Sequence, residues 1–117
     1  MFKVIVAGGR DFSNGLYLNK VLDHLLSKKQ EITILCGIAR GADTLGQHYA
    51  IQKGIPVEEY PAQWNKYGKS AGYRRNAVMA NNADALIAFW DGKSKGTMHM
   101  INLAKEAGLH VRVKSYG

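Results

Sequence analysis

The chain has 117 residues, 46% of them hydrophobic, and this size favours one domain with one hydrophobic core over a multidomain protein. Its 16 Lys and Arg residues outnumber its 9 Asp and Glu residues, which gives a formal net charge of +7 and favours an anionic partner. No stretch approaches the roughly 20 apolar residues of a membrane span, and the lone Cys36 cannot form an internal disulfide, so we expect a cytoplasmic protein without a membrane partner.

Short apolar runs alternate with segments of helical spacing along the whole chain. In chain order they predict a strand at residues 3–7, a helix at 16–26, a strand at 32–36, a helix at 42–50, a strand at 57–60, a helix at 71–82, a strand at 85–90, a helix at 97–107 and a strand at 109–113. Residues 61–69 show no regular pattern, and we interpret them as a functional loop or lid. Apolar strands that alternate with helices predict an α/β fold, in which a mostly parallel five-stranded sheet is the middle of three layers and carries helices on both faces.

Glycine-rich, charged or aromatic turns follow most of the predicted strands. They cover residues 8–11, 37–43, 60–64 and 91–97. In an open parallel sheet, ligands bind beyond the carboxyl ends of the strands, where the strand order reverses. We therefore expect the ligand site to be built from these turns.

The turn at residues 91–97 leaves an apolar strand and opens a helix, so its backbone N–H groups and the helix dipole predict an anion site. We expect phosphate contacts from Gly92, Ser94, Gly96 and Thr97. The turn is not a P-loop, because the Lys and Ser/Thr of that motif do not follow its second glycine here. The alternative is an exposed turn in which Ser94 or Thr97 caps the helix.

The turn at residues 37–43 is a second connection from a strand to a helix. Arg40 is placed to project over the sheet edge, and Gly41 permits a close approach of the backbone. Asp43 is a candidate for ribose hydroxyl contacts, although a carboxylate at a helix start is also favoured by the dipole alone. Its proximity to Arg10 and Asp11 at the neighbouring strand end favours the binding role.

Residues 70–76 predict a helix that begins with a Ser70 cap and carries Arg74 and Arg75 in its first turns. The helix dipole disfavours cations there, which indicates a compensating anion. The two arginines point about 100° apart on a helix, so only one of them faces the site squarely, and the sequence leaves open which one. The alternative is a solvated surface pair.

Other candidate residues carry less information. The 4 histidines show no metal-ligand spacing with each other or with Cys36, so we predict no metal site. Cys36 ends an apolar strand and is expected in the core. Trp64 lies in a predicted loop, and we expect it to stack on a base.

Four segments together resemble the YspA-type branch of the SLOG superfamily: Val4 to Phe12, Gly41 to Asp43, Tyr60 to Trp64 and Gly72 to Asn76. The resemblance covers nearly the whole chain. It implies a Rossmann-like domain over residues 1–117 that binds nucleotides or nucleotide-derived ligands.

Resemblance to two related families implies two alternative functions. The lonely-guy phosphoribohydrolases share a helix similar to Arg74 to Met79 and a loop similar to Lys95 to Thr97, but Met100 stands where their glutamate is. Glycosidic cleavage needs such a carboxylate, so we expect binding without catalysis. The DNA-processing protein A family has a turn similar to Cys36 to Asp43 and binds single-stranded DNA. The alternatives are therefore a nucleotide N-glycosidic hydrolase and a single-stranded nucleic-acid-binding domain.

We expect a protein that senses or sequesters a nucleotide-derived signal, such as an ADP-ribose-like molecule or a cyclic nucleotide. No catalytic residue, metal or cofactor is assigned, and a homo-oligomer is compatible with the sequence. Arg10, Arg40 and Arg74 are expected to neutralise the ligand, and Asp43 or Asp91 to bind ribose. The predicted ligand-binding residues are Gly8, Gly9, Arg10, Asp11, Arg40, Gly41, Asp43, Trp64, Arg74, Asp91, Gly92, Ser94, Gly96 and Thr97.

Overall fold

A computed structural model describes residues 2–37 and 41–116. The helices and strands follow the predicted order. They are β1 (Phe2–Gly8), α1 (Gly15–Leu26), β2 (Ile32–Cys36), α2 (Ala42–Lys53), β3 (Val57–Glu59), α3 (Trp64–Tyr67), the 3₁₀ turn η1 (Gly68–Ser70), α4 (Ala71–Asn82), β4 (Ala85–Trp90), α5 (Lys95–Glu106) and β5 (His110–Ser115).

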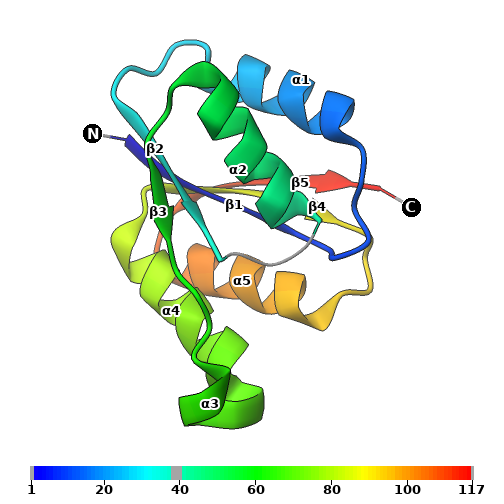
Figure 1. Ribbon diagram of the computed structural model, residues 1–117, viewed down its shortest axis with the longest axis vertical. Helices are drawn as coiled ribbons and strands as arrows, with labels where there is room; N and C mark the ends of the chain where they lie inside the picture. The colour runs from blue at the N-terminus through cyan, green and yellow to red at the C-terminus, as the bar shows by residue number, and fades with distance from the viewer. Residues whose placement is uncertain (1, 38–40, 117) are drawn as a thin grey trace.

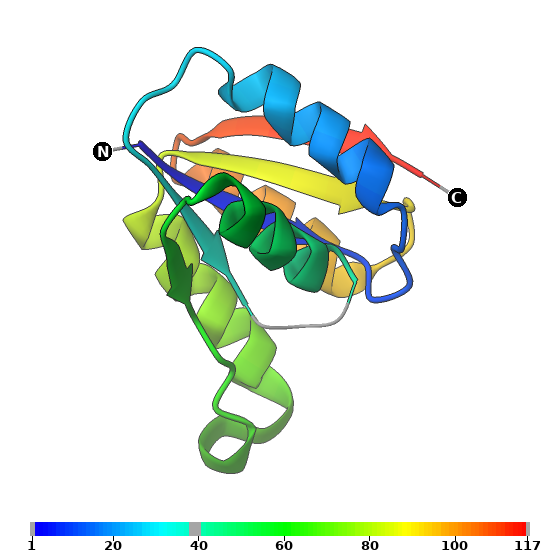
Figure 2. The same ribbon diagram turned by 45° about the horizontal axis from the view of Figure 1, so that its top comes forward.

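The five strands form one sheet in the order β3-β2-β1-β4-β5, and all neighbouring strands are parallel. Helices α1 and α2 cover one face of this sheet and α4 and α5 cover the other (Figures 1 and 2). The predicted α/β fold with three layers is therefore confirmed. The chain first builds outward from β1 to β3 and then returns to β4 on the other side of β1. The strand order thus reverses between β1 and β4, where open α/β sheets bind their ligands.

The hydrophobic core lies on both sides of the sheet because successive side chains of a strand point to opposite faces. In β1, Val4 and Val6 pack toward α1 and α2, whereas Ile5 and Ala7 pack toward α4 and α5. Cys36 at the end of β2 is fully buried, as expected. Burial on both faces explains why the central strands appear as continuous apolar runs in the sequence.

Of the two serines that the sequence offered as helix caps, Ser94 forms a cap and Ser70 does not. Ser94 caps α5, with its Oγ accepting the Thr97 N–H at 3.4 Å, as the sequence allowed. Ser70 precedes α4 but makes no cap bond. The chain enters α4 through the 3₁₀ turn, so the N–H of Ala71 bonds to the Gly68 carbonyl, and the Ser70 hydroxyl instead donates to the Tyr67 carbonyl at 3.0 Å.

The segment expected to be a loop contains a short helix. Residues 61–63 are irregular, but α3 and η1 follow directly and lie beyond the end of the sheet, at the bottom of Figure 1. A four-residue helix is too short to produce a periodic apolar pattern, so the sequence could not reveal it.

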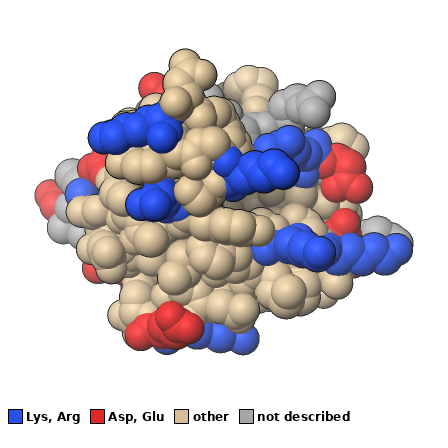
Figure 3. Space-filling model, turned by 90° about the horizontal axis from the view of Figure 1, so that it is seen from below, with Lys and Arg blue, Asp and Glu red and all other residues tan. Residues whose placement is uncertain are grey.

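The face formed by α3, α4 and α5 carries exposed cationic side chains (Figure 3). They include Lys66, Lys69 and Arg74 from α3, η1 and α4, Lys93 from the turn before α5, and Lys95 at the start of α5. None of the helices in the described part of the chain is long and apolar enough to cross a membrane.

Candidate functional site

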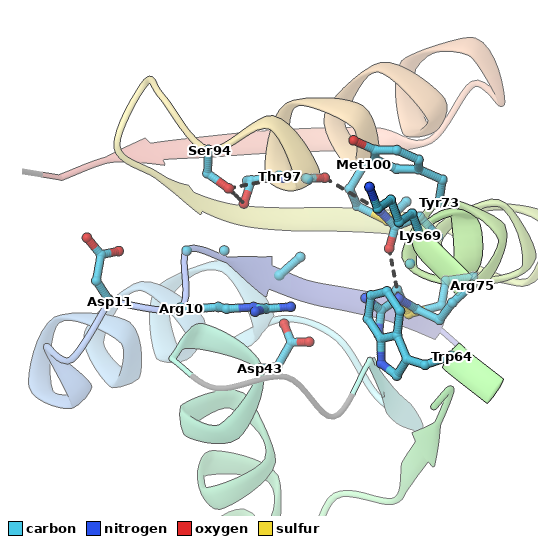
Figure 4. A pocket seen from close by; sticks show the side chains of 17 residues that line it. Arg10, Asp11, Asp43, Trp64, Lys69, Tyr73, Arg75, Ser94, Thr97 and Met100 are labelled. Carbon is cyan, nitrogen blue, oxygen red and sulfur yellow. Dashed lines mark hydrogen bonds between the residues drawn. The ribbon is translucent and has the colours of Figure 1, made fainter. Parts of the chain in front are cut away.

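A cleft of about 490 Å³ opens beyond the carboxyl end of β1. Its walls come from the turn after β1 and the start of α2 on one side, and from α4 and the start of α5 on the other (Figure 4). A volume of roughly 300–1,000 Å³ is typical of small-molecule sites. The cleft lies at the reversal of strand order, where the sequence placed the ligand.

Most of the predicted site residues meet in this cleft. Those that line it are Gly8, Gly9, Arg10, Asp11, Asp43, Trp64, Ser94, Gly96 and Thr97. Of the other predicted residues, Gly41, Arg74, Asp91 and Gly92 are described but are not part of its lining, and Arg40 lies outside the described residues. Binding of a ligand by any of them stays a prediction.

Asp91 and Gly92 shape the turn before α5. The Asp91 Oδ1 accepts the N–H groups of Lys93 at 2.8 Å and Ser94 at 2.9 Å. These two hydrogen bonds hold the pKa of Asp91 below its ordinary value. Gly92 has a φ of 83°, a conformation that favours glycine. Both residues therefore act on the backbone of the turn that presents Ser94 to the cleft.

Gly41 has a similar structural role at the start of α2. Its φ is 79°, and a Cβ atom there would overlap the carbonyl oxygen of Gly9. The turn after β1 and the start of α2 therefore approach closely only because residue 41 is glycine. This contact fixes one wall of the cleft.

The structure places Arg75, not Arg74, in the cleft lining. Arg74 is exposed, with its guanidinium 4.4 Å from the centre of the Tyr67 ring and its Nε donating to the Ser70 hydroxyl at 3.1 Å. Arg75 donates from Nη1 to the Gly37 carbonyl at 2.6 Å and from Nε to the Asn76 Oδ1 at 3.0 Å. The predicted arginine pair therefore divides into one surface residue and one cleft residue.

The charged groups of the cleft influence one another. Burial lowers the pKa of Arg75 most, Asp43 opposes this shift, and the positive charge of Arg10 adds to it. Arginine stays protonated at neutral pH despite such a shift, so both guanidinium groups are cationic. Figure 4 shows Arg10 extending along the cleft next to Asp43. Two close cations with one intervening carboxylate favour the binding of an anion.

The first turn of α5 contributes backbone donors. In helix geometry the first N–H groups have no intrahelical acceptor. Ser94 takes that of Thr97. The N–H groups of Lys95 and Gly96 lie at the positive end of the helix dipole, and Gly96 is part of the cleft lining. The indole Nε1 of Trp90 donates to the Ser94 carbonyl at 3.0 Å and anchors this turn to the end of β4.

Sequence reasoning missed the part of the lining that α4 and η1 supply. These residues are Lys69, Gly72, Tyr73, Asn76 and Met79, together with Ala7 from β1 and Met100 from α5, whereas Arg75 was one of the two arginines between which the sequence left the choice open. Positions 72, 75, 76 and 79 share one face of a helix, so their spacing was a usable signal. Met100 is 1% exposed at the cleft, at the position of the lonely-guy glutamate. In residues 2–37 and 41–116, no group of three or more His, Cys, Asp or Glu side chains could hold a metal ion.

Comparison with known proteins identifies the family. The family model of the YspA, cpYpsA-related SLOG family matches residues 2–67. Gene 61 protein of Mycobacterium phage D29 is 33% identical over 118 residues, which covers 95% of this chain and 94% of that protein. The chain belongs to the YspA, cpYpsA-related SLOG family. The predicted resemblance is confirmed, and membership in this SLOG family indicates a function related to nucleotides or nucleic acids.

A solved structure supports the fold of this SLOG family member. DNA processing protein A from Streptococcus pneumoniae superimposes with a TM-score of 0.73 at 21% sequence identity, over 96% of this chain. The matched region is 49% of that protein, so this chain spans about half of its length. The similarity confirms the Rossmann-like arrangement.

Proposed function

We propose that the cleft binds a nucleotide or a nucleotide-derived signal, such as an ADP-ribose-like molecule or a cyclic nucleotide, and that the protein acts as a sensor or a sequestering protein. One observation carries this proposal. A single cleft at the strand-order reversal contains a helix N-terminus, two arginines and an exposed tryptophan. These groups match the phosphate and the base of a nucleotide.

The phosphate is assigned to the end of the cleft near the first turn of α5. The backbone N–H group of Gly96 and the guanidinium groups of Arg10 and Arg75 are the donors that the cleft lining offers to it. Charge-assisted hydrogen bonds of this kind are roughly twice as strong as neutral ones. A dianionic phosphate also offsets the mutual repulsion of the two arginines.

The ribose is assigned to Asp43 at the start of α2. Its side chain is only 6% exposed and lies next to Arg10 in Figure 4. Carboxylates bind ribose hydroxyls in other Rossmann-like folds, which supports this role by analogy. Asp43 is preferred over Asp91, because Asp43 is part of the cleft lining and Asp91 is not.

The base is assigned to the outer end of the cleft. Trp64 on α3 and Tyr73 on α4 line it and are 51% and 46% exposed. Stacking of a base on an aromatic side chain contributes about 1–3 kcal/mol. It would cover apolar surface that is otherwise in contact with water.

Binding without turnover is the simpler function for this cleft. Cleavage of a glycosidic bond needs a group that stabilises a positive sugar or activates water. The buried Met100 thioether does neither. The lining of the cleft otherwise supplies the carboxylates of Asp11 and Asp43, and that of Asp11 accepts the Tyr116 hydroxyl at 2.7 Å.

A thermal-shift panel of nucleoside monophosphates, cyclic nucleotides, NAD and ADP-ribose tests the proposal. A ligand at about a hundredfold its Kd stabilises the fold by about 2.7 kcal/mol. At about 4 °C per kcal/mol for a domain of this size, this raises Tm by roughly 10 °C. Arg10→Ala should remove the shift, and Arg112→Ala, which changes an exposed arginine on β5, should not. The proposal fails if no compound in the panel changes Tm.

The exposed cations in Figure 3 favour single-stranded nucleic acid as a second candidate ligand. Lys69 on η1 lines the cleft and Arg74 on α4 is exposed outside the lining, so a strand that crosses both would leave the cleft along this surface. Fluorescence anisotropy with a labelled oligonucleotide separates the candidates. Tight binding with a steep salt dependence that is lost in a Lys69→Ala, Arg74→Ala double variant supports the nucleic acid. Weak binding that Arg10→Ala leaves unchanged supports the small molecule.

A further inference from the structure

The side chain of Asn76 connects three elements at the cleft. It lies on α4, is only 7% exposed and is part of the cleft lining. Its Oδ1 accepts the Arg75 Nε–H at 3.0 Å, and its Nδ2 is 3.5 Å from the Gly96 carbonyl and 3.4 Å from the His99 Nδ1. One amide thus contacts both the cleft arginine and the first two turns of α5.

The chemistry of these partners fixes the orientation of the amide. The Arg75 Nε is only a donor, and a backbone carbonyl is only an acceptor. The Asn76 oxygen must therefore face Arg75, and its nitrogen must face Gly96. The same nitrogen then donates to the His99 Nδ1, which places the histidine proton on Nε2. Reversing the amide would lose the hydrogen bonds to both Arg75 and the Gly96 carbonyl.

Asn76 also determines which part of Arg75 is available to a ligand. The Nε–H is held by Asn76 and one Nη1–H by the Gly37 carbonyl. A guanidinium has five N–H donors, so the remaining ones lie on the Nη1 and Nη2 side. The Nη2 lies 3.7 Å from where a Cβ of Gly72 would be, and the Trp64 Cη2 lies 3.5 Å from the same point. The available edge of the guanidinium therefore lies at the cleft, close to the indole.

The contacts of Asn76 to α5 reach the first turn of that helix, which is the second group to which the phosphate is assigned. The Gly96 carbonyl belongs to the first turn of α5, which lines the cleft through Gly96 and Thr97, and His99 lies one turn further along. The His99 ring also packs against the Tyr73 ring, with 4.4 Å between the centres. The first turn of α5 is thereby held against α4.

We propose that Asn76 is a positioning residue that holds the Arg75 guanidinium and the first turn of α5 at a fixed separation for the phosphate of the ligand. This inference rests on the proposed function. Preorganised donors lose less conformational freedom on binding than mobile ones. Removing the amide should therefore weaken anion binding even though Arg75 and the helix N-terminus remain.

Sulfate is a suitable probe because it is a phosphate-like dianion throughout the neutral pH range. Its affinity is measured by NMR titration of the Gly96 N–H and the Arg75 Nε–H signals. Asn76→Ala should bind sulfate up to about tenfold more weakly, because binding must then order the Arg75 side chain, at a cost of about 0.5–1.5 kcal/mol. Asn82→Ala is the matched control, because Asn82 ends the same helix and its side chain donates to the Val78 carbonyl within α4, away from the cleft lining. It should bind sulfate like the wild type.

Two further measurements separate positioning from a general structural role. The ¹⁵N spectrum of the histidines should show the Nε2–H tautomer of His99 in the wild type and in Asn82→Ala, and a tautomer mixture in Asn76→Ala. In a double-mutant cycle, Asn76→Ala should weaken sulfate binding much less when Arg75 is already alanine. If Asn76→Ala does not fold, Asn76→Ser, whose side chain is too short to contact all the partners, replaces it.

The outcomes are distinguishable. If the wild type binds neither sulfate nor any nucleotide, the proposed function fails and this inference fails with it. If the wild type binds sulfate and Asn76→Ala binds it equally well, only the positioning role of Asn76 is overturned. Strictly additive losses in the cycle with Arg75→Ala also overturn it, because Asn76 would then act on the anion by itself.

Discussion

Replacing Gly8 with alanine should destabilise the fold where β1 enters the cleft. A Cβ atom on residue 8 would lie 2.5 Å from the Phe89 carbonyl oxygen and 2.7 Å from the Ala42 Cβ. Neither neighbour can move easily. Phe89 and Ala42 are fully buried, and the Phe89 carbonyl also accepts the Gly9 N–H at 3.2 Å.

The size of the effect follows from these contacts. Overpacking of a close-packed core costs about 1–3 kcal/mol, and weakening the Gly9 hydrogen bond adds about 1 kcal/mol. Alanine lowers the entropy of the unfolded chain, which returns about 0.4–1 kcal/mol. We expect Gly8→Ala to lower the free energy of unfolding by about 2 kcal/mol.

Urea unfolding measures this difference, with Gly72→Ala as the matched control from the same cleft. A Cβ on Gly72 would make only ordinary contacts, at 3.5 Å from Trp64 and 3.7 Å from Arg75. Residue 72 lies within α4, where alanine is favoured over glycine by about 0.5–1 kcal/mol. Gly8→Ala should therefore lower the urea midpoint and Gly72→Ala should raise it. An unchanged or raised midpoint for Gly8→Ala would refute the steric reasoning.

Three other predictions can be tested with the same purified protein. Asn14→Ala should destabilise the fold by about 0.5–2 kcal/mol, because the Asn14 Oδ1 caps α1 by accepting the Tyr17 N–H at 3.0 Å. Ser70→Ala removes no cap bond and should destabilise the fold less. A larger loss of stability for Ser70→Ala than for Asn14→Ala in urea unfolding would contradict the assignment of the caps. Burial, and then the hydrogen bond to Glu58, raise the pKa of Tyr60 to about 12. The raised pKa of Tyr60 therefore stabilises the fold fully below the unfolded pKa near 10, and this stabilisation is lost as the pH rises toward 12. The urea midpoint of the wild type should fall over this pH range, and the midpoint of Tyr60→Phe should fall less steeply. Finally, incubation with nucleoside monophosphates and NAD should release no free base by chromatography, and turnover near 1 s⁻¹ or faster would contradict a pure binding function.

The elements of the fold could be predicted because their signals are local. Buried parallel strands require continuous apolar runs, and the helices between them require a periodic apolar face, so β1, β2, β4 and the longer helices were found within a few residues of their ends. The short helix α3 was missed because four residues are too few to show a period. The cap predicted at Ser70 does not form because the chain enters α4 through a 3₁₀ turn, in which the Ser70 hydroxyl donates to the Tyr67 carbonyl.

The sequence by itself determined the fold class and the edge of the sheet where the candidate site lies. Chain order and the alternation of strands and helices place all the turns after the strands at one edge, whatever the details of packing. The family membership is also determined by the sequence alone, because the family model matches residues 2–67. Nine of the residues chosen on these grounds line the cleft.

Only the tertiary structure decided which side chains face the cleft. The sequence shows Arg74 and Arg75 as neighbours of equal charge, and the choice between them depends on how α4 rotates against the sheet when Met79 and Ala80 pack into the core. This packing turns Arg75 toward Gly37 and leaves Arg74 on the surface against Tyr67. Helix rotation is set by contacts between residues far apart in the chain, which no local pattern contains.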